Sequence, residues 1–532
     1  MLESESSSHA RIYFANHSSS QLDPDFITSY IASEQAADHY SQAFHPEDLE
    51  RLIGPFRTSA LGLVPKPHTD TFRMIQDMSY PQNSPEVTSI NHGVDSKDFP
   101  MAWGSFDKAV ALVLSLPTGC LAATFDISAA YHLTPIRPDQ QHHLCVFWDN
   151  LVYLDRAVMF GLTSSAGVFG SIGDMLIAIY QKAGYSQILK WVDDFLVIRA
   201  PDNSWTEQDF IDLTGYFGVP WSMKKMRPLA TTQRYIGFDW DLVSRTVALP
   251  PEKYAKTLCL LVHWLSPGEK FLARDAASLH GKLVHISCIF PLIRPFLRGI
   301  ATFARSYKSP RAKLHAPPDL QADLSWVQFI VKNLPNEMPL APAQPLDLQW
   351  WGDASTSFGI GIVLGCYWAV WKWAPSFKVG PKQEFDIGWA EAVAVELGLR
   401  LAINLEFPSC TNIAGHTFLV RSDNAGVVFV TNKGRSRSRE TNKILKHLYL
   451  LQARHQIRLK SVHVASRDNI ADVLSRGAIT EFLTGFPAVD TQVSVPLPGH
   501  LADKLTSLQH LPSCHSRPHQ QLNHLQPPHL CS

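Results

Sequence analysis

Three aspartates in the first half of the chain are candidates for metal binding. Asp126 follows the apolar residues of TFDI, and Asp193 and Asp194 are adjacent within the apolar run WVDDFLVI. Burying carboxylates in apolar surroundings is costly unless a cation neutralises them. Two divalent ions would do so, and they would also activate a hydroxyl and stabilise a leaving pyrophosphate, as in polymerases. Taken singly, each of these acids is more typical of an ordinary turn.

Four acids in the last third of the chain form a second candidate set. Asp353 lies at the end of an expected strand in LQWWGDAS, and Asp423 lies at the end of another in HTFLVRSDN. Glu391 lies in the helical segment IGWAEAVAVELGLRLAIN, and Asp472 lies in IADVLSRG. Acids at strand ends and on packed helices can converge at one edge of a sheet, where they would repel each other without a divalent ion. With Mg²⁺ the set would position a water in line with a phosphodiester. Asp468, four residues before Asp472, is the alternative fourth ligand.

The elements that must position these acids belong to two α/β segments. Short β-rich runs alternate with amphipathic stretches in the first segment, and the second predicts strands, a helix, a strand, a helix, a strand and a helix. Between them, KTLCLLVHWL and DAASLHGKLVHIS have helical spacing. The expected divisions are a polar disordered extension at 1–45, α/β at 46–250, helical at 251–332, a Pro-rich linker at 333–345, α/β at 346–478 and a disordered Pro/His-rich tail at 479–532.

Charge is balanced over the whole chain but not locally. With 47 Lys+Arg against 48 Asp+Glu, the net charge of -1 gives no overall basic footprint. A segment almost free of acids nevertheless gathers basic residues that could bind the phosphates of a duplex. The alternative is a solvated helix face with a flexible loop. The basic residues that we expect to bind nucleic acid are Lys433, Arg435, Arg437, Arg439 and Lys443.

Cysteine usage and hydropathy bear on the compartment. The eight cysteines are widely scattered without a CxxC pair, which is typical of reduced thiols and predicts neither a disulfide framework nor a cysteine zinc site. No signal peptide is visible, and the apolar run from Ala109 to Phe125 is interrupted by Pro117 and Gly119. We therefore expect an intracellular protein, cytoplasmic or nuclear, without a membrane partner.

Six blocks over about residues 60–240 resemble the reverse transcriptases of retrotransposons, most closely the DIRS-type, with a gypsy-like element as the neighbouring possibility. They are LVPKPHTDTFRMIQDMSYP, TFDISAAYHLTPI, VMFGLTSSAGVF, WVDDFLVI, a lysine pair at 224–225, and RYIGFDW, in the family's order. The resemblance implies a right-hand polymerase with fingers, palm and thumb. It also implies that Asp126 and Asp193 bind the metals, with Asp194 as the third carboxylate.

The same resemblance suggests residues that bind the incoming nucleotide. Lys66 and Arg73 match the basic residues of the fingers strands, whose charge suits a triphosphate. Tyr131 matches the aromatic residue beneath the sugar, which implies a DNA product, although a core role is the alternative. Gly161 would permit close backbone approach to template or nucleotide. The chain departs from the family pattern at three positions beside this site: Trp191, Met159 and Ala166.

Residues 346–477 resemble ribonuclease H in its retroelement form. The resemblance rests on GDAS, the helix acid, SDN and the closing HVASRDNIADVLSR. It implies a mixed-sheet α/β domain in which Asp353, Glu391, Asp423 and Asp472 bind metal. His463 matches a mobile histidine used in turnover, although a histidine at a strand end is more often structural.

Together the resemblances imply a reverse transcriptase fused to ribonuclease H, from a mobile element. The expected cofactors are two Mg²⁺ or Mn²⁺ ions at each site. The expected partners are an RNA template, a DNA primer, the RNA:DNA hybrid, dNTPs and other proteins of the element. Two alternatives stay open: a decayed or domesticated remnant that binds nucleic acid without polymerising, and a protein in which only the hydrolytic domain works.

Overall fold

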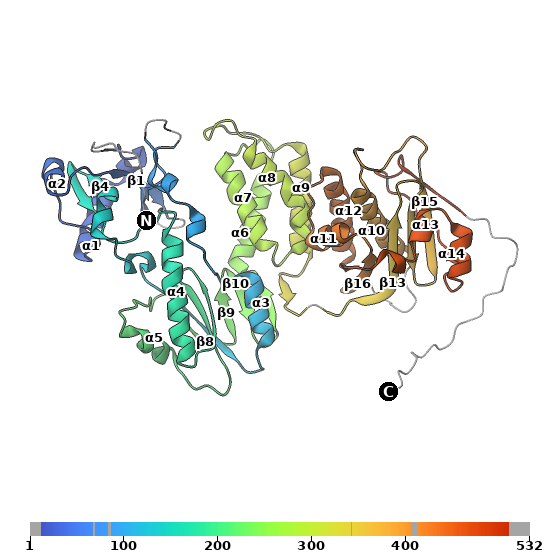
Figure 1. Ribbon diagram of the computed structural model, residues 1–532, viewed down its shortest axis with the longest axis horizontal. Coiled ribbons are helices and arrows are strands. Elements are labelled where there is room, and N and C mark those ends of the chain that lie inside the picture. Colours follow the sequence, from blue (N-terminus) through green and yellow to red (C-terminus); the bar gives the residue numbers. More distant parts are fainter. Residues whose placement is uncertain are drawn as a thin grey trace. The chain divides into compact units, whose positions relative to one another are not determined.

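The computed structural model describes residues 12–66, 70–82, 84, 87–341, 343–405 and 413–509. The chain divides into two compact units (Figure 1). Unit 1 comprises Met1–Pro250 and Glu337–Ala341, and unit 2 comprises Pro251–Asn336 and Pro342–Ser532. Helices and mixed sheets occur in both, which confirms the predicted α/β class. Within the described ranges, no helix combines the length and the apolar character needed to cross a membrane.

The first set of acids lies on a four-stranded sheet with the order β6-β7-β3-β8. β3 is a central strand and pairs antiparallel with both β7 and β8. Buried aromatic residues of the strands and of α4 and α5, among them Phe125, Phe195 and Phe210, form the core of this sheet. The bounds are β3 (Leu121–Asp126), α4 (Ser165–Lys182), β6 (Gln187–Trp191), β7 (Asp194–Arg199), α5 (Glu207–Gly215) and β8 (Arg227–Ala230).

A second sheet of unit 1, with the order β2-β1-β4-β5, packs against the N-terminal segment. The predicted disorder of residues 1–45 is wrong for the described part, because Ile27 and Ile31 of a helix are buried in this core. The serine-rich composition of this segment gave no sign of Ile27 and Ile31, two apolar residues one helical turn apart that pack into the core. The elements are η1 (Ser18–Leu22), α1 (Pro24–Ala36), α2 (Pro46–Ile53), β1 (Thr58–Pro65), β2 (Phe72–Asp77), η2 (Ile90–Gly93), η3 (Ser96–Asp98), η4 (Ala130–Leu133), η5 (Pro138–His143), β4 (Cys145–Trp148) and β5 (Leu151–Leu154).

A third sheet of unit 1 has the order β12-β11-β10-β9. The strand β12, which comes last in the sequence, overlaps the predicted linker at 333–345. That prediction is therefore wrong over Glu337–Pro339, where Met338 pairs with Val247 of β11. Helix α3 places Phe106 against Phe238 and Trp240 of β10. The bounds are α3 (Phe106–Ser115), β9 (Thr232–Tyr235), β10 (Phe238–Asp241), β11 (Thr246–Ala248) and β12 (Glu337–Pro339).

Unit 2 contains the large sheet that carries the second set of acids. Its order is β17-β16-β13-β14-β15-β18, and β19 also pairs with β15. Helix α10 is buried along nearly its whole length, because it packs on β13 and β14 and also contacts α12. The bounds are β13 (Leu346–Ala354), β14 (Gly359–Leu364), β15 (Tyr367–Trp373), α10 (Ile387–Asn404), β16 (Thr417–Ser422), α11 (Ala425–Lys433), α12 (Arg439–His455), β17 (Arg458–His463), η7 (Ser466–Asp468) and α13 (Asp472–Ser475).

A group of helices before this sheet belongs to the same unit. Helix α12 contacts η6, and the Nζ atom of Lys446 on α12 lies 2.5 Å from Oδ1 of Asp323 on α9. The carboxylate of Asp323 is nearly buried, so this ion pair fixes α9 against α12. The bounds are α6 (Pro251–Leu265), α7 (Ala273–Ile286), η6 (Pro291–Phe296), α8 (Leu297–Arg305) and α9 (Pro318–Asn333).

The C-terminal segment is ordered further than its composition predicts. Disorder over 479–532 is wrong for residues 479–509, which form α14 (Ile479–Gly485), β18 (Thr491–Gln492) and β19 (Leu505–Ser507). Phe482, Leu501 and Leu505 are buried. These apolar residues are too widely spaced to produce a periodic signal, yet each is buried in the folded unit. Residues 510–532 lie outside the described residues.

Candidate active sites

A tight hairpin brings the first set of acids together. Asp126 at the end of β3 is the direct cross-strand partner of Asp194 at the start of β7. Asp193 lies in the turn between β6 and β7, where Val192 adopts a positive φ of 54°, and its carbonyl accepts a hydrogen bond from the N–H of Ile127. We call Asp126, Asp193 and Asp194 the first carboxylate cluster. The predicted juxtaposition of Asp193 with the end of β3 is therefore present.

A lysine neutralises this cluster in part. Nζ of Lys225 lies 2.8 Å from Oδ1 and 2.9 Å from Oδ2 of Asp126. The loop that carries Lys225 is itself fixed to β3, because the N–H of Ser222 donates to the carbonyl of Asp126. The lysine pair was noted in the sequence as part of a block, but its contact with Asp126 could not be read from spacing.

The remaining two carboxyls of this cluster are destabilised in their charged form. Burial, and then the charges of Asp193 and Asp126, raise the pKa of Asp194 to about 6. Burial is also the main reason why the pKa of Asp193 is raised. One lysine therefore does not compensate three neighbouring carboxyls, and a divalent cation would relieve the excess negative charge.

Tyr131 lies close to the first carboxylate cluster. Burial, and then the charge of Asp193, raise the pKa of its hydroxyl. Its ring packs against Phe160 with centroids 4.6 Å apart. The side chain thus contributes to the core and also faces the acids, so the two interpretations drawn from the sequence are compatible.

The predicted role of Gly161 has a closer structural explanation. Its φ is 101°, and a Cβ atom at this position would lie 2.8 Å from the carbonyl oxygen of Gln76. Its own carbonyl accepts a hydrogen bond from Asn91. The close backbone approach that requires glycine is therefore made to β2 of the same unit.

Lys66 and Arg73 lie on the β1–β2 hairpin, in a different sheet from Asp126. Both side chains are exposed, and the N–H of Lys66 donates to the carbonyl of Thr71 across the hairpin. The structure therefore places both residues on this hairpin, whereas Asp126 ends a strand of the other sheet.

The second set of acids converges more tightly. One carboxylate oxygen from each of Asp353, Glu391 and Asp423 lies within 4.8 Å of the others. Asp353 comes from β13, Glu391 from the buried helix α10, and Asp423 from the end of β16, which pairs in parallel with β13. We call these three the second carboxylate cluster. Within the described part of the chain, the first cluster does not meet this distance criterion.

Burial strongly perturbs this second cluster. Desolvation, and then the charges of Asp353 and Asp423, raise the pKa of Glu391 to about 9. Desolvation is also the main cause that raises the pKa of Asp353 to about 7. Oε2 of Glu391 is buried and has no hydrogen-bond partner among the residues that the structure describes. An orphan oxygen within a group of three converging carboxyls fits the hard oxygen ligands that Mg²⁺ and Mn²⁺ prefer.

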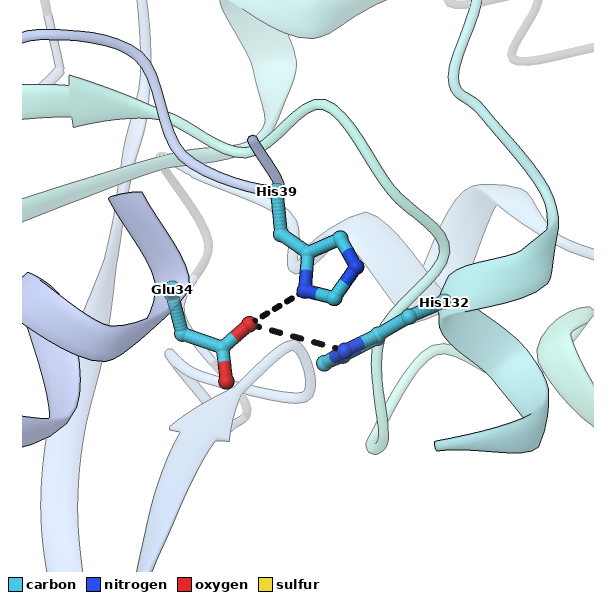
Figure 2. A group of neighbouring side chains, drawn as sticks. All are labelled: Glu34, His39 and His132. Atoms are coloured by element: carbon cyan, nitrogen blue, oxygen red, sulfur yellow. Dashed lines mark hydrogen bonds and ion pairs between the residues drawn. The ribbon is translucent and has the colours of Figure 1, made fainter. Parts of the chain in front are cut away.

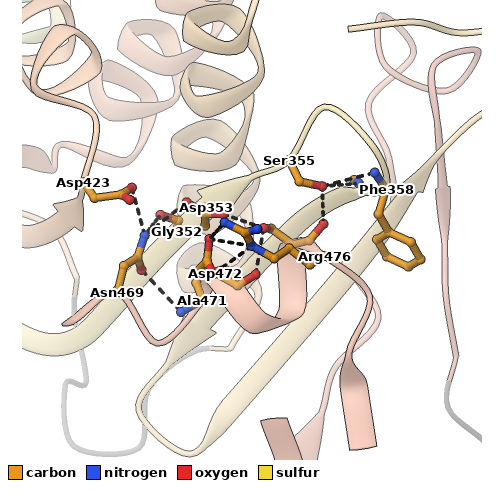
Figure 3. A network of polar contacts seen from close by, with 11 residues as sticks. Gly352, Asp353, Ser355, Phe358, Asp423, Asn469, Ala471, Asp472 and Arg476 are labelled. Carbon is orange, nitrogen blue, oxygen red and sulfur yellow. Dashed lines mark hydrogen bonds and ion pairs between the residues drawn. The ribbon is translucent and has the colours of Figure 1, made fainter. Parts of the chain in front are cut away.

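Two polar residues from the C-terminal part of the domain complete this site (Figure 3). Nδ2 of Asn469 donates to Oδ1 of Asp353 at 3.2 Å and to Oδ1 of Asp423 at 3.1 Å. The hydroxyl of Ser475 donates to Oδ2 of Asp353. Sequence reasoning missed both roles, although both residues lie in the HVASRDNIADVLSR motif, whose polar residues were the available signal.

The fourth acid is set apart from the other three. Asp472 accepts hydrogen bonds from the guanidinium of Arg476 at 2.8 to 3.0 Å, as Figure 3 shows, and its charge contributes to the raised pKa of Asp353. Asp468 is exposed and lies 3.8 Å from Arg467. His463 directs Nε2 to the backbone carbonyl of Asp423 at 3.1 Å, beside the cluster. The charge of Asp472 thus acts on the pKa of Asp353, whereas that of Asp468 is not among its causes.

The predicted basic residues line a groove in unit 2. The groove has a volume of about 780 Å³ and is lined on one side by α7, η6 and α8 and on the other by the loop after α11. Arg298 fixes that loop, since its guanidinium lies 3.2 to 3.5 Å from the backbone carbonyls of residues 436–438. Of the predicted set, Lys433, Arg435 and Arg437 line this groove, and Arg439 and Lys443 line an adjoining one.

The groove also gathers basic residues that we did not predict. Arg294, Arg298 and Arg305 come from the helical segment about 130 residues earlier in the chain. Lys443 is partly neutralised by Glu440 at 2.8 Å. Tertiary packing therefore produces a more basic surface than the sequence segment alone, and we call it the basic groove.

No family model and no curated protein matches the sequence. Among solved structures, a foamy viral protease-reverse transcriptase (dRH) in complex with double-stranded DNA is 15% identical with a TM-score of 0.46, and covers 87% of this chain and 73% of its own. A foamy viral protease-reverse transcriptase in complex with an RNA/DNA hybrid is 13% identical with a TM-score of 0.39, and the match covers 90% of this chain and 79% of that one. A third structure, a foamy viral protease-reverse transcriptase in complex with double-stranded DNA, is 13% identical with a TM-score of 0.44, and the match covers 86% of this chain and 87% of that one. Similarity at this level assigns neither an activity nor a residue role to this chain.

Proposed function

We propose that the chain is an RNA-directed DNA polymerase with ribonuclease H activity, from a retrotransposable element. The observation that carries this proposal is the presence of two separate carboxylate clusters in one chain, each within the motifs that resemble the corresponding enzyme. Each cluster contains carboxyls with raised pKa values, as expected where a divalent ion is to be bound.

In the proposed polymerase site, Asp126, Asp193 and Asp194 would bind two Mg²⁺ or Mn²⁺ ions. Those ions would activate the primer hydroxyl and stabilise the leaving pyrophosphate. Tyr131, whose hydroxyl pKa is raised in part by the charge of Asp193, would lie beneath the nucleotide sugar. Lys66 and Arg73 would contact the triphosphate, and Gly161 would preserve the shape of the nearby loop.

In the proposed ribonuclease H site, Asp353, Glu391 and Asp423 would bind the ions, with Asp472 as the fourth acid. With ions held by these residues, the site would have the chemistry to activate a water for attack on the phosphodiester and to offset the charge of the scissile phosphate. Asn469 and Ser475 orient the Asp353 carboxylate by hydrogen bonds, and His463 stands at the exposed rim of the site. The basic groove would bind the backbone of the hybrid, since its guanidinium groups suit phosphate.

The test uses the full chain with Mg²⁺ and, separately, Mn²⁺. One assay extends a DNA primer on RNA and on DNA templates, and the other cleaves a hybrid labelled in its RNA strand. We expect both activities in the wild type, loss of extension alone in Asp193→Asn, and loss of cleavage alone in Asp423→Asn. A folded wild-type protein that shows neither activity with either metal would overturn the proposal.

Two observations favour a narrower function in which only the hydrolytic site works. The first carboxylate cluster is less convergent than the second, and Lys225 contacts the carboxylate of Asp126. Cleavage that is lost in Asp423→Asn, together with no extension in the wild type, would identify that case. Binding of the hybrid in a gel-shift without either activity would instead identify a nucleic-acid-binding remnant.

A further inference from the structure

Unit 1 contains a group of metal-ligating side chains that is separate from both carboxylate clusters (Figure 2). Glu34 lies near the end of α1, His39 follows that helix, and His132 lies in η4. One ligand atom from each lies within 4.8 Å of the others. The two histidines come from segments that are 93 residues apart in the sequence, so no spacing pattern announces the group.

The Nδ1 atoms of both imidazoles face the same carboxylate oxygen of Glu34. Nδ1 of His39 lies 2.8 Å from Oε2 of Glu34, and Nδ1 of His132 lies 3.5 Å from the same Oε2, as Figure 2 shows. The rings are close to each other, with centroids 4.5 Å apart and planes inclined at 62°. A single hydrogen-bonded His–Glu pair does not require a second imidazole in this position.

We propose that Glu34, His39 and His132 form a zinc site. Two imidazole nitrogens and one carboxylate oxygen are a common set of protein ligands for zinc, with a fourth position for water. Ligand atoms bound to a tetrahedral zinc ion at about 2.1 Å are about 3.4 Å apart. The 3.5 Å separation between His132 and Glu34 already matches that spacing, and the 2.8 Å separation between His39 and Glu34 has only to open slightly.

The surroundings support a cation at this place. The Glu34 side chain is only 13% exposed, as is that of His132, and Tyr30 on the same helix forms a side-chain hydrogen bond with Glu34. Such a bond orients a ligating carboxylate. A second buried carboxyl, Asp155, is close enough that the charge of Glu34 contributes to its raised pKa. The adjacent Arg156 is engaged elsewhere, with Asp38 at 2.5 Å.

The metal class follows from the ligands. Imidazole nitrogen favours zinc and other late first-row ions, whereas Mg²⁺ prefers oxygen ligands. The site is therefore distinct in its chemistry from the carboxylate clusters, and it does not depend on the proposed catalytic function. Bound zinc would tie the N-terminal helix α1 to η4, the segment that carries Tyr131. We accordingly expect the ion to stabilise unit 1.

The experiment measures zinc binding to the full chain. Chelator-treated protein is titrated with Zn²⁺ in excess Mg²⁺, which competes at the carboxylate clusters, and the zinc content is measured after gel filtration. We expect one tightly bound Zn²⁺ per chain, with two imidazoles in the zinc X-ray absorption spectrum. His39→Ala and His132→Ala should each weaken binding at least about 100-fold, since even partners of the ligands are worth 10–100-fold.

His17 provides a matched control. Its Nε2 lies 3.0 Å from Oδ2 of Asp77 in the same unit, so it is an imidazole–carboxylate pair without the second histidine of the Glu34 group. His17→Ala should leave tight zinc binding and its spectrum unchanged. Glu34→Gln, which preserves shape, guards against a folding defect, and circular dichroism compares all variants. Zinc that binds equally to the His39 and His132 variants, or a spectrum without imidazole, or no tight zinc at all, would overturn the proposal.

Discussion

The two carboxylate clusters compensate their negative charge in different ways. In the first cluster, Lys225 lies within ion-pair distance of Asp126. In the second, neutral donors from Asn469 and Ser475 contact Asp353, and burial raises the pKa of Glu391 to about 9. The first site thus carries part of its countercharge in the protein, whereas burial favours the protonated form of the carboxyls in the second.

The supporting elements explain this difference. Glu391 projects from a helix buried on nearly all sides, so its carboxyl cannot move into water. Asp193 lies in a tight turn and is partly exposed, and the largely exposed side chain of Lys225 contacts Asp126 of the same cluster. If both sites bind metal as proposed, the more buried one would depend on it more than the hairpin that retains its own cation.

The largest expected effect is loss of the second activity alone. Asp353→Asn should reduce hybrid cleavage at least about 1,000-fold, because a lost metal ligand removes several kcal/mol of stabilisation of the transition state. Primer extension should be unchanged. Both rates are measured on the same preparation.

The matched control concerns the fourth acid. Asp468→Asn should cleave like the wild type, because Asp468 is exposed and lies beside Arg467. Asp472→Asn should be impaired to an intermediate degree, since Arg476 already shares its charge. Loss of cleavage in Asp468→Asn with retention in Asp472→Asn would reverse this assignment.

The second prediction concerns the pH dependence of stability in unit 2. A carboxyl whose pKa is raised on folding binds its proton more tightly in the folded state, so its contribution is present at low pH and is lost as pH rises. For Glu391 the loss should run from about pH 4.5 to about pH 9. At about 1.4 kcal/mol per pKa unit, the total is on the order of a few kcal/mol.

Amide hydrogen exchange of α10, corrected for its intrinsic pH dependence, measures this effect. Without divalent metal, protection of α10 should fall as pH rises, and Mg²⁺ should restore it. Glu391→Gln should flatten the profile because the amide does not titrate. An unchanged slope in that variant would show that Glu391 is not the responsible group.

The sequence contained much of the fold of the second α/β domain and the identity of its acids. Strand and helix periodicity located β13 to β15, α10, β16, α12 and β17, and strand-end acids pointed to one edge of the sheet. Helix α11 was missed because its run of Val, Phe and Thr resembles a strand. The connection between the parallel strands β16 and β17 already contains the predicted helix α12, so their pairing did not call for a second helix.

The unpredicted parts depend on contacts between distant segments. The Lys225–Asp126 ion pair joins residues 99 positions apart, and Asn469 reaches Asp353 over 116. The guanidinium of Arg298 likewise reaches the backbone of Arg437 over 139 positions. Such contacts have no local periodicity, and only the packed fold places the donor beside the acid.

The third prediction tests the protein-borne cation of the first cluster. Lys225→Met should strengthen Mn²⁺ binding there by about fivefold or less, because a partly exposed ion pair competes only weakly with the metal. The pKa of Asp194, which Lys225 now lowers, should rise further in the metal-free protein. Mn²⁺ binding is followed by electron paramagnetic resonance in the Asp353→Asn background, with Lys224→Met as control. Weaker Mn²⁺ binding in Lys225→Met would mean that the lysine supports the metal site.

The smallest expected effect concerns the basic groove, through which unit 2 would hold its substrate. Arg437 lines the groove with an exposed side chain, while its backbone carbonyl accepts the bond from Arg298, so Arg437→Ala removes charge without removing that contact. Hybrid binding should weaken only about two- to threefold at moderate salt, equally for all sequences, and the slope of log affinity against log salt should fall by about one.

Arg274→Ala is the matched control, because Arg274 is an exposed arginine of α7 that does not line the groove, and this variant should leave the slope unchanged. Fluorescence anisotropy at several salt concentrations measures both. Equal slopes for the two variants would show that the phosphates contact another surface, and the comparison of the two sites would then concern their chemistry alone.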